Sequence, residues 1–384
     1  MFNQNLKHIE KDNTFSLVNK KINKYKKDNP KAKIISLGIG DVSKPISEPV
    51  IKAMHKAVDD LADMKSFKGY GNYYGLLKLR QTILDNDYKD FNFGIDEVYV
   101  SDGTKSDSTN ILELFDDDVK ILLANPLYPI YKNGCEALSK KIFEVSLNKE
   151  YKMDVPNKHY DVIYLCSPNN PIGNAYTYKE LIEFVKYAKK EKAIIVYDNV
   201  YEPFISSADV PHSIYEIKGA KKCAIELRSF SKKASFTGLR CSYFIIPKQI
   251  DKDINYYWKE RTLNRFNGAS YVAQVGAIAS YSKKAIKIQK QNIKEYMKNA
   301  KFLKDSFMEL GFKVIGGEDA PFMWVDVRQN SWKYFDFCLK RLNVIVIPGV
   351  IFGSNGENHI RISALGKIED SIIAIRRFKE YYEK

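Results

Sequence analysis

The sequence predicts an α/β protein with a mostly parallel central sheet covered by helices, followed by a smaller α+β lobe. Its 384 residues exceed what one ordinary compact core holds. Between residues 97 and 247, short apolar runs alternate with helical stretches, which is typical of strands buried on both faces of a parallel sheet. After about residue 249 this alternation stops. We therefore expect an N-terminal arm with part of the small domain at 1–48, a large ligand-binding domain at 49–280, and a small C-terminal domain at 281–384.

Helices are predicted over residues 14–28, 46–62 and 74–87. The first has Phe15, Val18, Ile22 and Tyr25 on one face, and Asn13 or Thr14 is suited to cap its start.

A short strand over 33–37 leads into the turn Gly38-Ile39-Gly40-Asp41. This turn resembles the opening of a dinucleotide-binding fingerprint. Ser43 replaces the third glycine, however, and Pro45 interrupts the helix that should follow, so we exclude a Rossmann cofactor site. A tight turn that exposes its backbone to a ligand, with Gly40 beside a substrate, is the better interpretation.

Six apolar runs predict the strands of the central sheet, at 98–100, 119–123, 162–166, 193–197, 224–227 and 243–246. Polar clusters follow five of these runs, at 101–105, 125–129, 167–171, 198–201 and 228–240. Because the carboxyl ends of parallel strands meet at one edge of a sheet, we expect these clusters to converge on one ligand.

The second lobe begins after a long helical region that runs from about residue 249 to 310. Short strands are predicted at 312–315, 322–325, 344–347 and 360–362, and helices at 331–340 and 367–383.

The charge and composition exclude several classes of function. Lys and Arg number 61 against 47 Asp and Glu, but the lysines are spread along the chain and form no basic block with stacking aromatics, so no nucleic acid is expected. The five cysteines form no CxxC pair and the five histidines no HxxxH spacing, so neither a disulfide framework nor a metal site is expected. Without a signal peptide or a membrane-spanning run, we expect a protein of the reducing cytoplasm with no membrane contact.

The stretch from 228 to 240 carries the main functional signal. Lys232 follows a buried strand, and a desolvated lysine near other cations has a lowered pKa and can form a Schiff base with an aldehyde. Ser229, Ser231 and Arg240 supply donors that suit a phosphate. The combination suggests a phosphorylated aldehyde, pyridoxal 5′-phosphate. A surface loop with two lysines is the alternative interpretation of this stretch taken alone.

The other strand ends supply the remaining groups that such a cofactor needs. Asp198 ends a buried strand, so its pKa rises unless a cation such as a protonated pyridine nitrogen pairs with it. Tyr201 and Asn170 can donate hydrogen bonds to the ring's phenolate oxygen, and Tyr128 can stack on the ring. The helix that opens at 103–105 offers backbone N–H groups to a phosphate.

Arg361, late in the second lobe, can bind a substrate carboxylate in a bidentate manner. Each of these residues also has an ordinary structural interpretation: Asp198 as a cap, Tyr128 as a packing aromatic, Arg361 as an exposed strand residue. Their agreement at successive strand ends favours a common site.

The chain contains, in order, the motifs GIGD, GYGxxxG, SDGTK, NPLYP, SPNNPxG, YDxxY, SFSK–x7–R and HIRIS. This set resembles the fold-type I pyridoxal phosphate aminotransferases over nearly the whole chain. Residues 29–41, 266–270 and 320–324 further resemble one subfamily, the LL-diaminopimelate aminotransferases of lysine biosynthesis.

The resemblance implies a fold-type I transferase that works as a homodimer with active sites at the subunit interface. It implies a ping-pong exchange of an amino group between an amino acid and a 2-oxo acid, with 2-oxoglutarate and glutamate as one pair. The resemblance implies that Lys232 forms the Schiff base and transfers the proton between Cα and C4′, that Asp198 contacts N1, that Tyr201 and Asn170 contact O3′, and that Tyr128 contacts the ring. It implies that Ser229, Arg240, Thr104 and Lys105 bind the phosphate and that Arg361 binds the α-carboxylate. It also implies that Tyr70 and Asn267 reach in from the second subunit.

Two positions depart from the subfamily. Tyr73 stands where a glutamate usually holds the distal ammonium of diaminopimelate, and Asn13 stands where a substrate-facing tyrosine is usual. Neither side chain carries a charge for that ammonium, and sites built for charged groups discriminate strongly by such pairing. An aromatic or apolar substrate is therefore the alternative. A C–S lyase or a decarboxylase is a second alternative, and a non-catalytic regulator is disfavoured because Lys232 is present and no helix-turn-helix module precedes residue 30.

Overall fold

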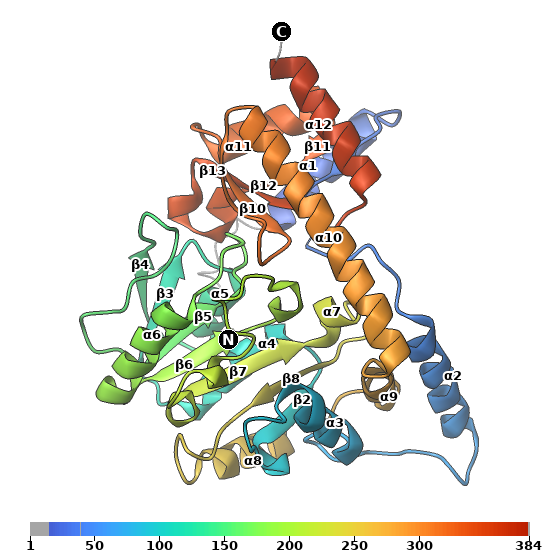
Figure 1. Cartoon of the computed structure of the whole chain (residues 1–384), viewed down its shortest axis with the longest axis vertical. Helices are drawn as coiled ribbons and strands as arrows, with labels where there is room; N and C mark the ends of the chain where they lie inside the picture. Colours follow the sequence, from blue (N-terminus) through green and yellow to red (C-terminus); the bar gives the residue numbers. More distant parts are fainter. Residues whose placement is uncertain (1–14, 39, 383–384) are drawn as a thin grey trace, which may run out of the picture.

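A seven-stranded sheet forms the centre of the larger lobe (Figure 1). Its order is β2-β8-β7-β6-β5-β3-β4, and all pairs from β7 to β4 are parallel, whereas β8 is antiparallel to both of its neighbours. The strands are β2 (Val98–Ser101), β3 (Lys120–Asn125), β4 (Lys141–Ser146), β5 (Val162–Cys166), β6 (Ile194–Asp198), β7 (Ala224–Ser229) and β8 (Ser242–Ile245). The computed structural model describes residues 15–38 and 40–382. The predicted α/β class with a mostly parallel sheet is confirmed.

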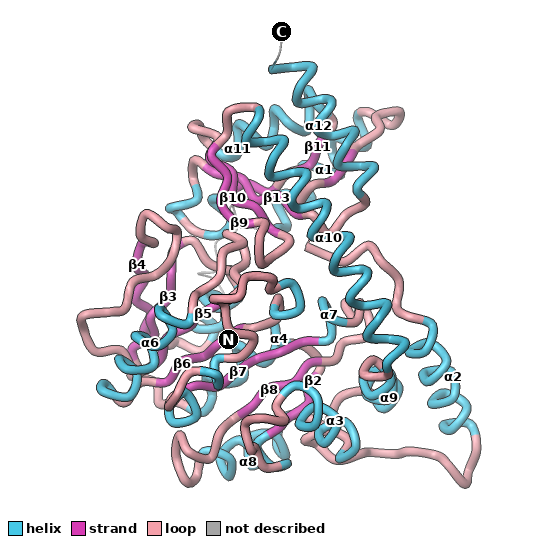
Figure 2. Tube along the Cα trace, viewed as in Figure 1, coloured by secondary structure: helices cyan, strands magenta, loops and turns pink. Residues whose placement is uncertain are grey.

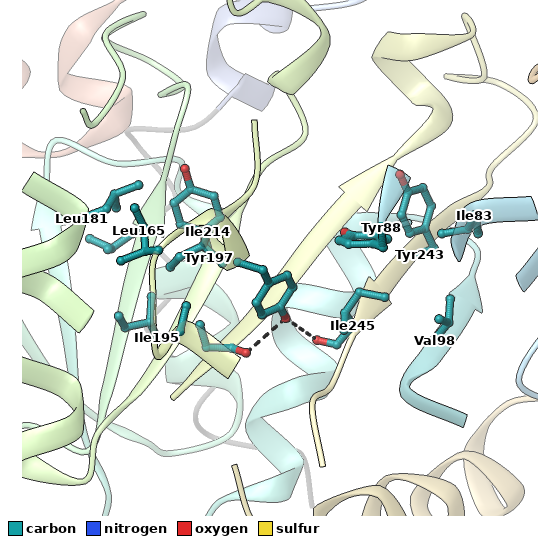
Figure 3. Close-up of a cluster of buried hydrophobic side chains, with 14 of the residues drawn as sticks. Ile83, Tyr88, Val98, Leu165, Leu181, Ile195, Tyr197, Ile214, Tyr243 and Ile245 are labelled. Carbon is teal, nitrogen blue, oxygen red and sulfur yellow. Dashed lines mark hydrogen bonds between the residues drawn. The ribbon is translucent and has the colours of Figure 1, made fainter. Parts of the chain in front are cut away.

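Both faces of this sheet are buried, as the continuous apolar runs predict. Along β5, Ile163 and Leu165 belong to one hydrophobic core, while Val162 and Tyr164 belong to the core on the other face. Figure 3 shows Leu165 in the first core together with side chains from neighbouring elements. The helices of this lobe are α2 (Glu48–Ala62), α3 (Leu77–Asp87), α4 (Thr104–Asn110), α5 (Ile130–Ala137), α6 (Tyr178–Glu191), α7 (Phe230–Lys233), α8 (Ile254–Arg265) and α9 (Tyr271–Ala279).

Strand β4 was not expected from the sequence. It lies at one edge of the sheet and pairs only with β3 there, and its residues are exposed or half-buried. Ile142 and Val145 pack only partly against the cores on the two faces. An edge strand that is only partly covered needs no continuous apolar run, so the pattern that identified the other strands is missing here.

The smaller lobe holds a second, antiparallel sheet of order β12-β13-β10-β9 and a parallel pair β1-β11. Figure 2 shows these strands as a group separate from the large sheet. The strands are β1 (Ile35–Ser36), β9 (Lys313–Gly316), β10 (Phe322–Asp326), β11 (Val344–Ile345), β12 (Ile347–Pro348) and β13 (His359–Ser363), and the helices are α1 (Phe15–Asp28), α10 (Lys283–Glu309), α11 (Ser331–Phe337) and α12 (Ile368–Tyr382). Pairing of Ile35 with Val344 joins the N-terminal segment to this lobe.

Several boundaries differ from those expected. The helical region from 249 to 310 is three helices, α8, α9 and α10, and the expected strand over 344–347 is divided between β11 and β12, which pair with different strands. The cap expected at residues 13–14 lies outside the described part of the chain. Short 3₁₀ turns lie at Ile95–Glu97, Ile111–Leu114, Glu202–Phe204, Ile214–Glu216, Ala220–Lys222, Gly349–Phe352 and Ser354–Gly356, and a π turn at Cys338–Leu342 follows α11.

The long helix α10 contributes to both lobes (Figure 1). Ala285 near its start belongs to a core of the large lobe, whereas Leu303 and Phe307 belong to the core of the small lobe. The division of the chain at residues 48 and 280 stays a prediction. Among the described residues, no helix is both long enough and apolar enough to cross a membrane.

A buried charge cluster supports β7 behind its carboxyl end. The Glu226 side chain is 0% exposed and accepts hydrogen bonds from Tyr88 (2.9 Å) and Ser213 (2.7 Å). It also forms a 2.6 Å ion pair with Arg228, which in turn lies 3.2 Å from Glu202. Because a buried charge is stable only when paired, this cluster depends on every member being present.

We expect Glu226→Ala to destabilise the protein by about 3 kcal/mol, because Arg228 loses its closest carboxylate while remaining buried. Urea unfolding of the cofactor-free protein measures this loss. Glu183→Ala is the matched control, since Glu183 and its partner Lys186 are both largely exposed and their pairing contributes little. Equal unfolding midpoints for the two variants would contradict the prediction.

Candidate active site

A cavity of about 420 Å³ lies where the strand ends of the large sheet face the small lobe. Elements from both lobes line it. The predicted site residues that line it are Gly40, Thr104, Lys105, Tyr128, Asn170, Asp198, Tyr201, Ser229, Ser231, Lys232, Arg240 and Arg361. The structure thus brings together residues that are more than 300 positions apart in the sequence.

Three predicted residues are not in this cavity. Tyr70 and Asn267 line a different cavity of about 610 Å³, and Tyr73 lines one of about 240 Å³. Asn13 lies outside the described residues. Within one chain, Tyr70 and Asn267 therefore do not share a cavity with Lys232.

Lys232 lies on α7, a single helical turn that follows β7 directly. The Ser229 hydroxyl caps the turn by accepting a 3.0 Å hydrogen bond from the backbone N–H of Ser231. The Lys232 ammonium donates to the backbone carbonyl of Gly40. Burial lowers the pKa of Lys232 to about 8. The charge of Asp41 opposes this shift, and the smaller effects of Arg361 and Arg240 act in the same direction as burial.

Asp198 ends β6 and is buried. Its carboxylate accepts hydrogen bonds from the Tyr131 hydroxyl and, at 3.3 Å, from the backbone N–H of Val200. Burial nevertheless raises the pKa of Asp198 to about 6. A protonated ring nitrogen is the type of ligand that would restore the carboxylate here.

Tyr131 is a site residue that the sequence analysis missed. It lies on α5, three residues after Tyr128, and its hydroxyl is the side-chain donor to Asp198. Burial raises the pKa of Tyr131 well above its ordinary range, so it remains a donor. The one signal in the sequence is its position two residues after the polar cluster at 125–129, which contains Tyr128.

Hydroxyls and cations gather around the start of α4. Gly103 has a φ of +150°, and a Cβ there would overlap the guanidinium of Arg240. This position therefore requires glycine for both reasons. Thr104 and Lys105 of α4 line the cavity together with Ser229 and Arg240. These donors suit a phosphate group.

Arg361 on β13 lies in the cavity wall opposite the large sheet. Its Nη1 donates to the Asn170 side chain at 2.8 Å and its Nη2 to the Gly38 carbonyl at 3.0 Å, while its Nε is buried without a partner among the described residues. The rings of Phe322 and Phe352 flank the guanidinium at 4.7 and 4.9 Å. Burial lowers the pKa of Arg361 to about 10. A carboxylate ligand would pair this otherwise unpaired charge.

One wall of the cavity is apolar. Phe15, Val18 and Ile22 of α1 and the two isoleucines Ile345 and Ile347 form it. In the sequence these residues have the pattern of ordinary core positions, and nothing distinguishes them from the core residues next to them. Only the packing of α1 against the strand segment 344–348 shows that they face a cavity.

The residues present fit pyridoxal phosphate. Lys232 offers an amine with a lowered pKa, Asp198 a buried carboxyl without a cation, and the start of α4 a set of phosphate donors. Within residues 15–38 and 40–382, no group of three or more His, Cys, Asp or Glu side chains could hold a metal ion.

Comparisons with known proteins show the family of this chain. The family model described as aminotransferase class I and II matches residues 32–378. The LL-diaminopimelate aminotransferase of Lawsonia intracellularis is 40% identical over 95% of each chain, and that of Bacteroides thetaiotaomicron is 40% identical over 96% of each. The solved structure of the enzyme from Chlamydomonas reinhardtii has a TM-score of 0.94 and 36% identity, and the match covers 100% of this chain and 98% of that one.

The family of these relatives is that of enzymes that exchange amino groups between amino acids and oxo acids, and it implies a pyridoxal phosphate cofactor. The resemblance drawn from the motifs is therefore confirmed at the level of the family. This chain belongs to the class I and II aminotransferases, the family that includes the LL-diaminopimelate aminotransferases it resembles over nearly its whole length.

Proposed function

We propose that this enzyme binds pyridoxal 5′-phosphate through Lys232 and transfers an amino group from LL-diaminopimelate to 2-oxoglutarate. The observation that carries the proposal is the cavity in which the pKa of Lys232 is about 8 and the Arg361 guanidinium has no carboxylate partner. The choice of amino donor is supported by the names of the relatives that are 40% identical.

When bound, the cofactor supplies an electron-withdrawing ring that stabilises negative charge at the substrate Cα. Asp198 holds the ring nitrogen in its protonated form, and Tyr131 orients that carboxylate. Tyr201 and Asn170 donate to the phenolate oxygen. Thr104, Lys105, Ser229, Ser231 and Arg240 hold the phosphate.

Lys232 and Arg361 act on the substrate. Arg361, already oriented by Asn170 and Gly38, binds the α-carboxylate. Lys232 in its neutral form accepts the proton from Cα and returns it at C4′. Water would supply the oxygen of the departing 2-oxo acid, and the amino group would stay on the cofactor. A second 2-oxo acid would take up that amino group in the reverse sequence of steps, with release of water.

We further propose a homodimer in which each active site uses residues of both chains. Tyr70 is 86% exposed, and neighbouring apolar side chains such as Phe67 and Met64 are 62% and 97% exposed. An exposed apolar surface of this kind is typical of a protein–protein contact. Tyr70 and Asn267 share one cavity on this surface, as expected if they complete the site of a second copy.

A second substrate class is favoured by one observation. The apolar wall of Phe15, Val18, Ile22, Ile345 and Ile347 offers no charge to a distal ammonium, and Tyr73 adds none. An aromatic or apolar amino acid is therefore the competing amino donor.

Titration with LL-diaminopimelate, followed by aromatic and acidic amino acids, separates these alternatives. We expect loss of the yellow absorbance of the lysine-bound cofactor with LL-diaminopimelate, because the relatives share the site. Loss with an aromatic amino acid alone would reject diaminopimelate and keep the aminotransferase. Formation of a keto acid without an added acceptor would instead identify a C–S lyase.

Lys232→Ala should reduce turnover by at least about a thousandfold, because it removes both the covalent attachment and the proton carrier. Steady-state transamination measures this, with the thermal unfolding midpoint as evidence of folding. Lys222→Ala, at an exposed lysine, is the matched control and should leave turnover unchanged. Retained turnover in the Lys232 variant would reject this residue as the Schiff-base lysine.

The rate at which the cofactor-free enzyme captures pyridoxal phosphate should rise about tenfold per pH unit below pH 8 and level off above it. Only the neutral amine reacts, and burial lowers the pKa of Lys232 to about 8 from its ordinary 10.5. Growth of the yellow absorbance, followed by borohydride reduction to trap the bond, measures the rate. A rate that keeps rising through pH 10 would show an unperturbed lysine.

A further inference from the structure

Lys233, the neighbour of Lys232 on α7, lies on the side of the turn away from the cavity. Its ammonium binds both carboxylate oxygens of Asp87, at 2.8 and 3.1 Å. Asp87 is the last residue of α3. A salt bridge therefore connects the turn that carries Lys232 to a helix elsewhere in the large lobe.

The Asp87 carboxylate is held from several directions. The hydroxyl of Tyr243 on β8 donates to it at 2.5 Å, and the hydroxyl of Tyr281, between α9 and α10, donates to the same oxygen. The ring of Tyr281 also lies 4.3 Å from the Lys233 ammonium. Burial disfavours the carboxylate, but the charges of Lys233 and Arg228 and these hydrogen bonds outweigh burial and hold the pKa of Asp87 below its usual range.

A helix of one turn is too short to be stable by itself, so its position depends on tertiary contacts. Phe230 anchors one side in the hydrophobic core and is 0% exposed. Lys233 anchors another side through Asp87. Lys232, between them in sequence, is then directed into the cavity.

The salt bridge between Lys233 and Asp87 also affects the charge close to Lys232. The Lys233 ammonium is one residue from Lys232, whose own surroundings are Asp41, Arg361, Arg240 and the ring of Tyr201. The Asp87 carboxylate cancels the Lys233 charge. Of the other charged groups nearby, Glu202 faces Lys233 and Asp87 as well as Arg228 and His212.

We propose that Asp87 and Lys233, with Tyr243 and Tyr281, form a positioning device for Lys232 that anchors its helical turn and cancels the charge beside it. This inference rests on the proposed role of Lys232 as the lysine that binds the cofactor. Lys233 and Asp87 themselves do not line the cavity.

The test is a pH titration of the enzyme loaded with pyridoxal phosphate. Its midpoint is the pH at which the yellow absorbance is half lost as the pH rises. Asp87→Asn leaves the Lys233 ammonium uncompensated, so the midpoint should fall by about half a pH unit. Lys233→Met leaves the Asp87 carboxylate uncompensated, so the midpoint should rise by a similar amount. The double variant should return close to the wild-type midpoint, and Lys233→Arg should retain it.

The matched control is the exposed pair Lys301 and Asp305 on α10, where Lys301→Met and Asp305→Asn should leave the midpoint unchanged. Midpoints of Asp87→Asn and Lys233→Met that both equal the wild-type value, or that move in the same direction, would overturn the proposal. Lys233→Gln replaces Lys233→Met if the latter does not fold. Absence of the yellow absorbance in the wild-type enzyme would overturn the cofactor assignment too, so the two failures are distinct.

Discussion

The site depends on keeping a half-buried lysine, Lys232, without a carboxylate within ion-pair distance. Lys232 donates to the Gly40 carbonyl, and burial outweighs the charge of Asp41, while Arg361 and Arg240 further disfavour the ammonium. Such a group is unfavourable for folding, since its ammonium loses water and forms no ion pair that would offset this loss. The same environment makes its amine available near neutral pH. The cost to stability and the reactivity therefore have one physical cause.

Both lobes are needed to create this environment. β7 and α7 supply Lys232 from the large lobe, whereas Gly40 and Arg361 come from the N-terminal segment and from β13. Pairing of β1 with β11 keeps the N-terminal segment on the small lobe. Separation of the lobes would expose Lys232 and Arg361 to water together and remove the low-dielectric surroundings that shift their pKa values.

Charges that face the cavity are left without partners, while charges behind it are paired. Arg361 and Lys232 bind only neutral groups of the chain. Behind β7 and α7, by contrast, Arg228 pairs with Glu226 and Lys233 pairs with Asp87. This division leaves the anionic groups of a cofactor and a substrate as the natural partners for the free cations.

Much of the large sheet was predictable, because strands buried on both faces require continuous apolar runs. The edge strand β4 was not predictable, since its residues are exposed or half-buried and form no continuous apolar run. Polar clusters after strands pointed to Asp198, Asn170 and Lys232, and the structure places these in one cavity. The sequence does not show that Tyr131 and the α1 residues Phe15, Val18 and Ile22 line the cavity. A buried tyrosine or an apolar helix face has the same local pattern in an ordinary core.

The sequence by itself determined the strands, their polar ends and hence the chemistry available, since hydrophobic periodicity and residue type are local properties. Only the tertiary structure decided which charges are neutralised. Lys232 and Lys233 are adjacent and chemically identical, yet one faces a cavity and the other a carboxylate from residue 87. That difference arises from burial and from partners far away in the chain, and both depend on how the helices and sheets pack.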